Sequence, residues 1–345
     1  MRFSFIVLFL FLFPIVAEAS MVEAFVDSYY AYDFNAPSSG KRAFTTQPLY
    51  HNQPNINLAY GGFNVSNENW RGRLIIQGGN SVEANTLREK SDLKYLQESY
   101  IGRKFGDVWV DGGIYLGHIG AESWISKDNW TYSRALNLDY VPYYSTGFRI
   151  TYKNFQLHLM NGWQTIRDDN TAKSVGTQYI KKFGEEVTFT LNTFFGDEEQ
   201  VPGPDGKFRP RFRGYYNFIL KFEPGGNWQY LAAVDFGHQS QQANTGVDGW
   251  GAATFTARRK LDEKRFIAGR IEHYYDPHKA NVIGTKNGFV TSGLSVNFDQ
   301  YLASTTMWRT EVRGFSSRDE IYPAGKGGLS RMDGFIATSL SLWLP

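Results

Sequence analysis

The sequence predicts an all-β fold, a transmembrane antiparallel β-barrel of about 16 strands. Three observations predict it. Segments of about ten residues alternate apolar and polar side chains, long and short connections between them alternate, and no run after residue 20 is apolar and long enough for a membrane-spanning helix. A soluble sandwich has no reason to sort its connections by length. A membrane barrel does, because its short turns face the periplasm and its long loops face outside.

The N-terminus has the pattern of a secretory signal peptide. Arg2 supplies the charged region, Phe5 to Ala17 the apolar region, and Ala17-Glu18-Ala19 a small-x-small cleavage site. The apolar region is too short for a membrane-spanning helix, which takes about 20 residues. We therefore expect residues 1–19 to be a cleaved signal peptide and residues 20–345 to form a single barrel domain.

Composition excludes several other classes of protein. The chain has no Cys, which rules out disulfides, a thiolate metal site and a cysteine nucleophile. Its formal net charge of +2 is too balanced to suggest a nucleic-acid partner. An aromatic fraction of 17% together with 35 Gly favours long strands with aromatic girdles over a helical core. No Pro/Ser-rich linker or charge run divides the chain, so one domain is the better interpretation.

Sixteen segments have the length and the alternation of membrane strands. In 70–79, for example, Trp70 and Leu74 share the face expected to meet lipid, and Arg71 and Arg73 share the opposite face. The predicted strands are 24–34, 55–65, 70–79, 93–105, 107–117, 147–153, 155–163, 174–183, 186–196, 211–222, 228–237, 248–260, 265–275, 288–298, 301–313 and 332–344. An even number places both termini on the periplasmic side.

The predicted inner faces are charged and amidic. In 211–222, Phe218 and Leu220 oppose Arg213 and Asn217. A small soluble barrel fills its interior with aliphatic side chains, so these faces predict a wet interior.

The connections sort into two sets. The long loops are expected at 36–53, 81–92, 119–146, 164–173, 197–209 and 314–331. The tight turns are expected at Asn67-Glu68-Asn69, Lys153-Asn154, Asp262-Glu263-Lys264 and Asp299-Gln300. Counting 134–142 as a further strand would put the longest later loops on the wrong side, so we include it in loop 119–146.

Several aromatic-rich stretches resemble one family over essentially the whole mature chain. They are Asp27 to Asn35, Glu122-Ser123-Trp124, Asp128 to Arg134, Pro142 to Gly147, and Ser339 to Trp343. These stretches resemble the putative β-barrel porin-2 (OmpL-like) family. The resemblance implies an outer-membrane porin of a Gram-negative bacterium, without an established substrate. It also implies contacts with outer-membrane lipid, the outer-membrane assembly machinery and small hydrophilic solutes or ions. Most general porins of this size are trimers, so a homotrimer is one alternative and a monomer the other.

The third long loop, 119–146, is the candidate pore constriction, because the third outer loop of sixteen-stranded general porins folds inward. It carries three acids, Glu122, Asp128 and Asp139, with Trp124, Trp130, Tyr132 and Tyr140 available to pack it against the wall. The arginines expected on the inner wall are Arg71, Arg73, Arg103, Arg149, Arg211, Arg213, Arg270, Arg309 and Arg313. Loop carboxylates facing wall arginines would set a transverse field that favours small polar solutes.

A simpler interpretation is that these charges only solvate the lumen or pair with each other. Glu311 lies between Arg309 and Arg313 on one strand face, and Glu272 accompanies Arg270.

Catalytic and metal sites are weakly indicated. His118 beside Ser123 and Asp128 is the one group of residues that suggests a hydrolase. His273 and His278 lie on either side of a strand end and a Pro turn. Their spacing favours a chance pairing at a loop mouth over a metal site. We expect no enzymatic activity, no cofactor and no metal. The predicted function is passive diffusion of small hydrophilic solutes across the outer membrane. The alternative is a non-conducting barrel with an adhesive or envelope-structural role, and an outer-membrane hydrolase is a distant third.

Overall fold

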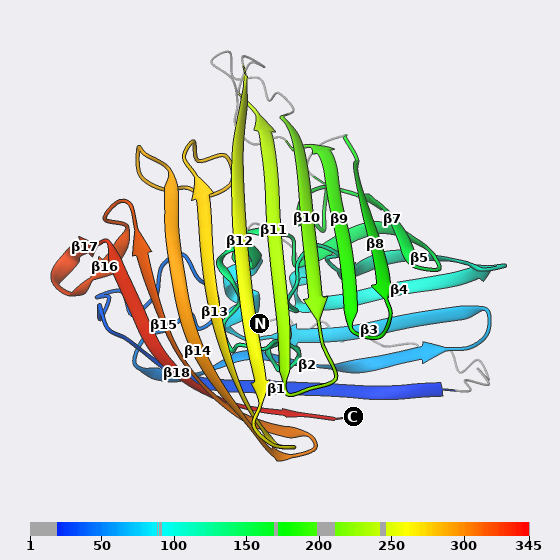
Figure 1. The fold of residues 1–345 in the computed structure, drawn as a ribbon. Coiled ribbons are helices and arrows are strands. Elements are labelled where there is room, and N and C mark those ends of the chain that lie inside the picture. The colour runs from blue at the N-terminus through cyan, green and yellow to red at the C-terminus, as the bar shows by residue number, and fades with distance from the viewer. Residues whose placement is uncertain are drawn as a thin grey trace, which may run out of the picture.

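The computed structural model is a closed antiparallel barrel of 16 strands, in which the last strand pairs with the first. It describes residues 19–87, 89, 92–168, 172–198, 211–241 and 246–344. Figure 1 shows β18 (Met332–Trp343) running beside β1 (Ala19–Asp33), which closes the wall. The all-β barrel prediction is therefore confirmed. The predicted signal peptide lies outside the described residues except for Ala19, and so does most of the predicted loop 197–209.

Each strand pairs with its neighbour in the chain, and all 16 predicted strands are found. The remaining barrel strands are β2 (Gln53–Ser66), β3 (Trp70–Gly78), β4 (Leu96–Phe105), β5 (Val108–Leu116), β6 (Tyr144–Tyr152), β7 (Phe155–Met160), β8 (Ser174–Phe183), β9 (Val187–Asp197), β10 (Phe212–Phe222), β11 (Trp228–Ser240), β12 (Val247–Lys260), β13 (Arg265–Asp276), β14 (Phe289–Ala303) and β15 (Thr306–Ser317).

Long and short connections alternate as predicted, with one error among the turns. The turns at 67–69, 153–154 and 261–264 lie where they were expected. The turn predicted at Asp299-Gln300 is wrong, because both residues lie inside β14 and the chain reverses at 304–305. The reason is that Asp299 pairs directly with Arg309 across the β14–β15 ladder and accepts two hydrogen bonds from its guanidinium.

The long loops contain short elements of their own. Loop 79–95 carries α1 (Asn80–Asn85) and η1 (Asp92–Tyr95), and loop 318–331 carries the hairpin of β16 (Tyr322–Ala324) and β17 (Gly328–Ser330) with η5 (Gly325–Gly327) between them. The third loop carries η2 (Ser126–Asp128) and η3 (Leu136–Tyr140). The segment 134–142 therefore belongs to the loop and is not a strand. No helix among the described residues is long and apolar enough to span a membrane.

The strand faces alternate as the sequence predicts. Along β10, Phe212, Tyr216, Phe218 and Leu220 are exposed on the outside, while the residues between them are buried. Arg103 was wrongly assigned to the inner wall. It shares the outer face of β4 with the exposed Ile101, and its guanidinium stacks over the Trp70 ring, 5.1 Å from the centroid.

Part of the interior differs from the wet lumen that was predicted. Near the long-loop ends of the strands, a large apolar cluster fills the space between the wall and the loops. Its wall members are Tyr29, Ala31, Phe194, Tyr215, Trp250, Ala252, Tyr274, Phe289, Phe315, Phe335 and Ala337, and its main loop members are Ile119, Tyr132, Leu136, Leu138, Val141, Val282 and Ile321. Aromatic side chains at inward positions of the strands thus pack against folded loops instead of facing water.

Candidate functional site

In the structure the third long loop runs from residue 117 to residue 143, between β5 and β6. Side chains of the inner wall bind the backbone of this loop. The Arg309 guanidinium of β15 donates to the carbonyl oxygens of Ser126 and Asn129, the latter at 2.6 Å. The Asn297 side chain of β14 accepts a hydrogen bond from the Tyr132 amide at 3.1 Å. Wall side chains thus satisfy part of the polar backbone of the loop, which allows the loop to lie in a buried position.

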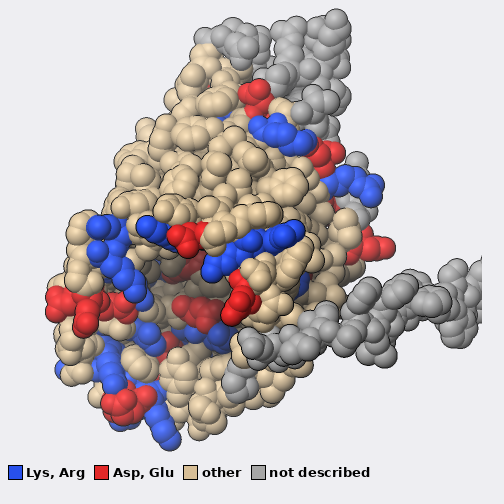
Figure 2. Space-filling model, turned by 90° about the vertical axis from the view of Figure 1, so that its right-hand side faces the viewer, with Lys and Arg blue, Asp and Glu red and all other residues tan. Residues whose placement is uncertain are grey.

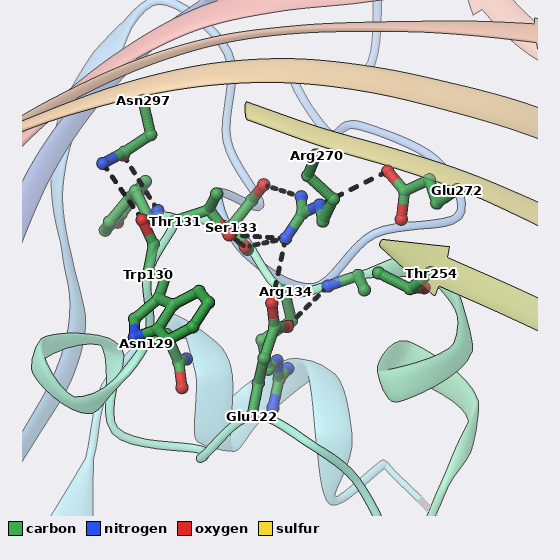
Figure 3. Close-up of polar contacts among 12 residues, drawn as sticks. Glu122, Asn129, Trp130, Thr131, Ser133, Arg134, Thr254, Arg270, Glu272 and Asn297 are labelled. Atoms are coloured by element: carbon green, nitrogen blue, oxygen red, sulfur yellow. Dashed lines mark hydrogen bonds and ion pairs between the residues drawn. The ribbon is translucent and has the colours of Figure 1, made fainter. Parts of the chain in front are cut away.

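A buried charge cluster on β13 and β15 holds the middle of this loop. Figure 3 shows its β13 members, Arg270 and Glu272, beside Ser133 of the loop. Arg313 donates to the Glu272 carboxylate at 2.6 Å, and Arg270 lies 3.4 Å from the Glu311 carboxylate. The Ser133 hydroxyl of the loop accepts from both guanidiniums at 2.9 Å and donates to Glu311 at 2.9 Å. The four wall side chains are fully buried. Removing one partner of such a cluster leaves an uncompensated buried charge.

The three predicted constriction acids have different surroundings. Glu122 is buried, lies 3.2 Å from Arg270 and accepts from the Ala135 amide at 2.8 Å. Burial raises the pKa of Glu122 and outweighs the opposing effect of the Arg270 charge. Asp139 is also buried and lies 3.4 Å from Arg134. Asp128 is the exception, because its side chain is 45% exposed and pairs with Lys127 at 2.7 Å.

A second group of charges lies on β3, β5 and β6, away from the loop anchors. Arg71 donates to both carboxylate oxygens of Asp111, each at 2.6 Å, and Arg149 donates to the same carboxylate at 2.8 Å. Gly102 lies between them on β4. A Cβ there would lie 2.1 Å from the Asp111 carboxylate, so a glycine is required for the three side chains to meet. We call Arg71, Asp111 and Arg149 the β3–β6 triad.

A neighbouring group has the opposite balance of charge. Arg73 of β3 lies 2.5 Å from Glu23 of β1 and 3.0 Å from Glu98 of β4. One guanidinium is therefore shared by two carboxylates, where the β3–β6 triad has one carboxylate shared by two guanidiniums.

The remaining predicted wall arginines lie near the long-loop ends of the strands. Arg213 donates to the Gln239 side chain at 2.7 Å and stacks over the Trp163 ring, 4.8 Å from its centroid. Arg211 donates to the Ser240 carbonyl oxygen at 2.7 Å. Both are engaged with neighbouring residues of the wall and loops.

The sequence analysis did not name Asp111 and Asp299 as site residues, although these acids pair with the wall arginines Arg71, Arg149 and Arg309. Asp111 accepts from Arg149 on the neighbouring strand and from Arg71 two strands away, and Asp299 accepts from Arg309 on the neighbouring strand. Arg258, two strands from Asp299 on the other side, forms a longer ion pair with it at 3.9 Å. The sequence did carry a signal for these pairs. Each aspartate is at an inward position directly opposite an inward arginine of the next strand, Asp111 opposite Arg149 and Asp299 opposite Arg309. Arg258, Asp299 and Arg309 form a second triad, on β12, β14 and β15.

The short-turn end of the barrel is hollowed. Figure 2 shows an opening at this end, with Lys, Arg, Asp and Glu side chains around and inside it. Glu23, Arg71 and Arg149 are on the inner faces of their strands and remain partly exposed. The solvent-accessible charge of the interior is therefore concentrated at this end, while the charges that anchor the loop are buried.

His118, the candidate hydrolase histidine, contacts residues of the wall rather than Ser123 or Asp128. His118 bonds through Nε2 to the Thr193 carbonyl oxygen at 2.9 Å and stacks on His158, with ring centroids 4.1 Å apart. Burial lowers the pKa of His118 to about 4, so the ring is neutral at pH 7. Among the described residues, no hydrogen bond or ion pair joins it to Ser123 or Asp128, as a hydrolase site would require.

The two histidines considered as metal ligands at the loop mouth, His273 and His278, contact different residues. His273 contacts the Ser292 hydroxyl and His278 lies 3.8 Å from Asp248. Within the described ranges there is no group of three or more His, Cys, Asp or Glu side chains that could hold a metal ion.

The chain is similar to one family and to several solved structures. The family described as Putative beta-barrel porin-2, OmpL-like, matches residues 21–340. The outer-membrane-expressed OmpT of Vibrio cholerae has 9% identity and a TM-score of 0.63, with 94% of this chain and 97% of that chain covered. The anion-selective porin from Comamonas acidovorans has 9% identity and a TM-score of 0.61, with 94% and 99% covered. The outer membrane channel DcaP of Acinetobacter baumannii has 9% identity and a TM-score of 0.60, with 94% and 97% covered. No curated protein matches. At these identities the structural likeness shows the fold alone.

Proposed function

Because the chain belongs to the Putative beta-barrel porin-2, OmpL-like family, we propose that it is an outer-membrane channel for passive diffusion of small hydrophilic solutes. The observation that carries the proposal is the hollow short-turn end, where charged side chains of the inner wall remain partly exposed inside a closed barrel. An interior that is polar and open to water is what a diffusion channel needs, and the apolar outer face suits the bilayer.

We further propose that loop 117–143 forms the constriction. Its anchors on β13–β15 bring the loop against one wall, so the path for solutes runs beside the loop rather than through it. The exposed Asp128 and its partner Lys127 are the loop charges available to a solute, whereas Glu122 and Asp139 act as anchors of the loop. Arg71, Arg73 and Arg149 are the wall charges that line the same space.

A second candidate function is a non-conducting barrel with an adhesive or envelope-structural role. The observation that favours it is the apolar cluster at the long-loop end, where residues of the third loop, such as Leu136 and Leu138, pack against wall aromatics. A cluster of this kind obstructs part of the cross-section.

Reconstitution of the purified full-length protein into a planar lipid bilayer separates the two functions. A diffusion channel gives stepwise current increases well above those of detergent-only controls. A non-conducting barrel gives none, although the same sample shows the gel mobility shift between unheated and boiled protein that is typical of a folded barrel. Liposome swelling in isosmolar sugars of increasing size would then measure the size limit for solutes.

We also propose a homotrimer as the assembly, since one structural neighbour, OmpT of Vibrio cholerae, is described in a trimer form. Chemical crosslinking of outer-membrane fractions tests it, and a ladder that stops at the monomer would contradict it.

A further inference from the structure

We infer that the channel prefers anions, and that the β3–β6 triad is the place where a small carboxylate solute docks as it passes. The inference rests on the proposed channel function and adds the class of solute. It is carried by the charge balance of the triad, the exposure of its members and the rings that hold them.

The triad carries one positive charge in excess. Both carboxylate oxygens of Asp111 are occupied by guanidinium donors, at 2.6 Å from Arg71 and 2.8 Å from Arg149. The second triad, on β12, β14 and β15, repeats this balance, with Asp299 between Arg258 and Arg309. Asp111 on β5 and Asp299 on β14 are seven and nine strand steps apart in the two directions around the barrel, so the two triads lie on facing walls. The second triad is largely buried, which leaves the β3–β6 triad as the more exposed of the two.

The exposed atoms of the β3–β6 triad are those of the arginines. The side chain of Asp111 is fully buried, while those of Arg71 and Arg149 are 27% and 17% exposed. A solute at this wall therefore meets guanidinium groups and not the carboxylate that holds them. The bonds to Asp111 use Nε and Nη2 of Arg71 and Nε of Arg149, which leaves Nη1 of Arg71 outside them.

Aromatic rings hold both guanidiniums in position. The Arg71 guanidinium lies 4.5 Å from the Trp109 ring centroid, and that of Arg149 lies 5.1 Å from Tyr100 and 5.0 Å from Tyr115. Stacking of this kind fixes the planar group at little further entropic cost. Because a guanidinium has several N–H donors in one plane that match the two oxygens of a carboxylate, a fixed and partly exposed guanidinium favours carboxylate solutes over spherical anions.

The Arg73 group does not offer a comparable site. Its single guanidinium is shared by Glu23 and Glu98, so the group has one negative charge in excess. The contrast between these neighbouring groups locates the predicted anion site on Asp111 and its two arginines.

The test is the reversal potential of the reconstituted full-length protein in a tenfold gradient of potassium chloride. The wild type is expected to show anion preference. The double variant Arg71→Gln/Arg149→Gln is expected to lower the chloride-to-potassium permeability ratio by about fivefold or more, the effect of removing unit charges a few ångströms from the ion in water. The control is Arg103→Gln, which removes an arginine from the outer face of neighbouring β4 and is expected to leave the ratio unchanged.

Potassium acetate tests the carboxylate class. With the wild type, acetate conductance is expected to saturate as concentration rises, because a docking site fills. The double variant Arg71→Lys/Arg149→Lys keeps the charge and loses the planar set of donors, so it is expected to keep chloride preference and lose the saturation.

The possible results distinguish failure of the anion preference, of the carboxylate site and of the channel function. Cation preference of the wild type, or an unchanged ratio in the glutamine double variant with the folded gel mobility retained, would overturn the inference while leaving the channel intact. Acetate conductance that stays linear in the wild type would overturn the carboxylate site. Absence of any conductance would instead contradict the proposed function.

Discussion

Two sets of arginines on the inner wall look alike in the sequence and differ in the structure. Arg270, Arg309 and Arg313 are fully buried, and each binds loop 117–143. Arg71 and Arg149, on the other side of the barrel, bind no loop residue in the contacts described and remain partly exposed. The difference teaches that an inward charge in a barrel has two distinct uses. One set holds loop 117–143, and the other set is the one that we propose to meet the solute.

The loop explains why the two sets differ. The wall is polar on both sides, but the polar contacts described for the loop come mainly from β8–β15. Glu272 accepts from the Leu136 amide, Asn217 of β10 accepts from the Gly120 amide, and Asp235 accepts from the Asn137 side chain. Once the loop lies there, the arginines beneath it lose contact with water. Those on the β3–β6 side keep it.

The largest effect is expected from breaking the buried cluster. Glu272→Ala removes the carboxylate that pairs with Arg313 at 2.6 Å and accepts from the Leu136 amide at 2.6 Å. It leaves an uncompensated buried charge, so we expect a loss of about 3–5 kcal/mol in the free energy of unfolding. Urea titration of the folded fraction, read from gel mobility, measures it.

The control for this variant is Glu263→Ala in the exposed 261–264 turn, where no measurable change is expected. An equally small change for Glu272→Ala would show that the cluster does not hold the loop.

The next largest effect concerns pH. His118 is neutral in the fold because burial lowers its pKa to about 4 from the ordinary value of 6.5. The unfolded chain binds a proton at this site as pH falls below about 6.5, while the folded chain does not until about pH 4. Stability from this group is therefore complete above pH 6.5 and is lost as pH falls toward 4, by roughly 3 kcal/mol.

The variant His118→Gln is expected to remove this loss, since Gln does not titrate. Thermal midpoints of the folded form at pH 7.5 and pH 4.5 measure it. If the midpoint of the variant falls as far as that of the wild type between these two values, His118 is not the group responsible.

The smallest effect is expected from the exposed set. Arg71→Gln breaks a pair whose cation is 27% exposed, so water compensates part of the loss and we expect about 1 kcal/mol in the same urea titration. Arg103→Gln, which loses stacking contacts on the outer face with Trp70 and Phe105, sets the lower limit. A loss for Arg71→Gln as large as that for Glu272→Ala would erase the distinction between the two sets.

The strands and their faces were predictable from the sequence, because a period of two is a local property. Phe218 and Leu220 against Asn217 in β10 fix a face without any tertiary contact. Asp299-Gln300 was misassigned because a polar pair reads as a turn unless its partner is known, and the partner, Arg309, is ten residues away. Arg103 could have been placed correctly, since Ile101 and Phe105 share its face.

The division of the arginines was not predictable. Arg71 and Arg313 have the same local pattern, and only the path of loop 117–143 decides which of them is covered. The aromatic filling of the long-loop end was missed for a similar reason. Phe194 and Tyr215 are inward aromatic residues in a polar wall. Their burial depends on loop residues that pack against them, which the local pattern does not predict.

Accessibility to a charged thiol reagent tests most directly whether the path for solutes runs beside the loop. The chain has no Cys, so single variants report without background. In bilayer recordings, Asp128→Cys and Arg71→Cys are expected to change conductance when a charged methanethiosulfonate is added. Glu122→Cys, whose side chain lies on the buried, wall-facing side of the loop, is expected not to respond. A response from Glu122→Cys with none from the other two would place the path on the wrong side of the loop.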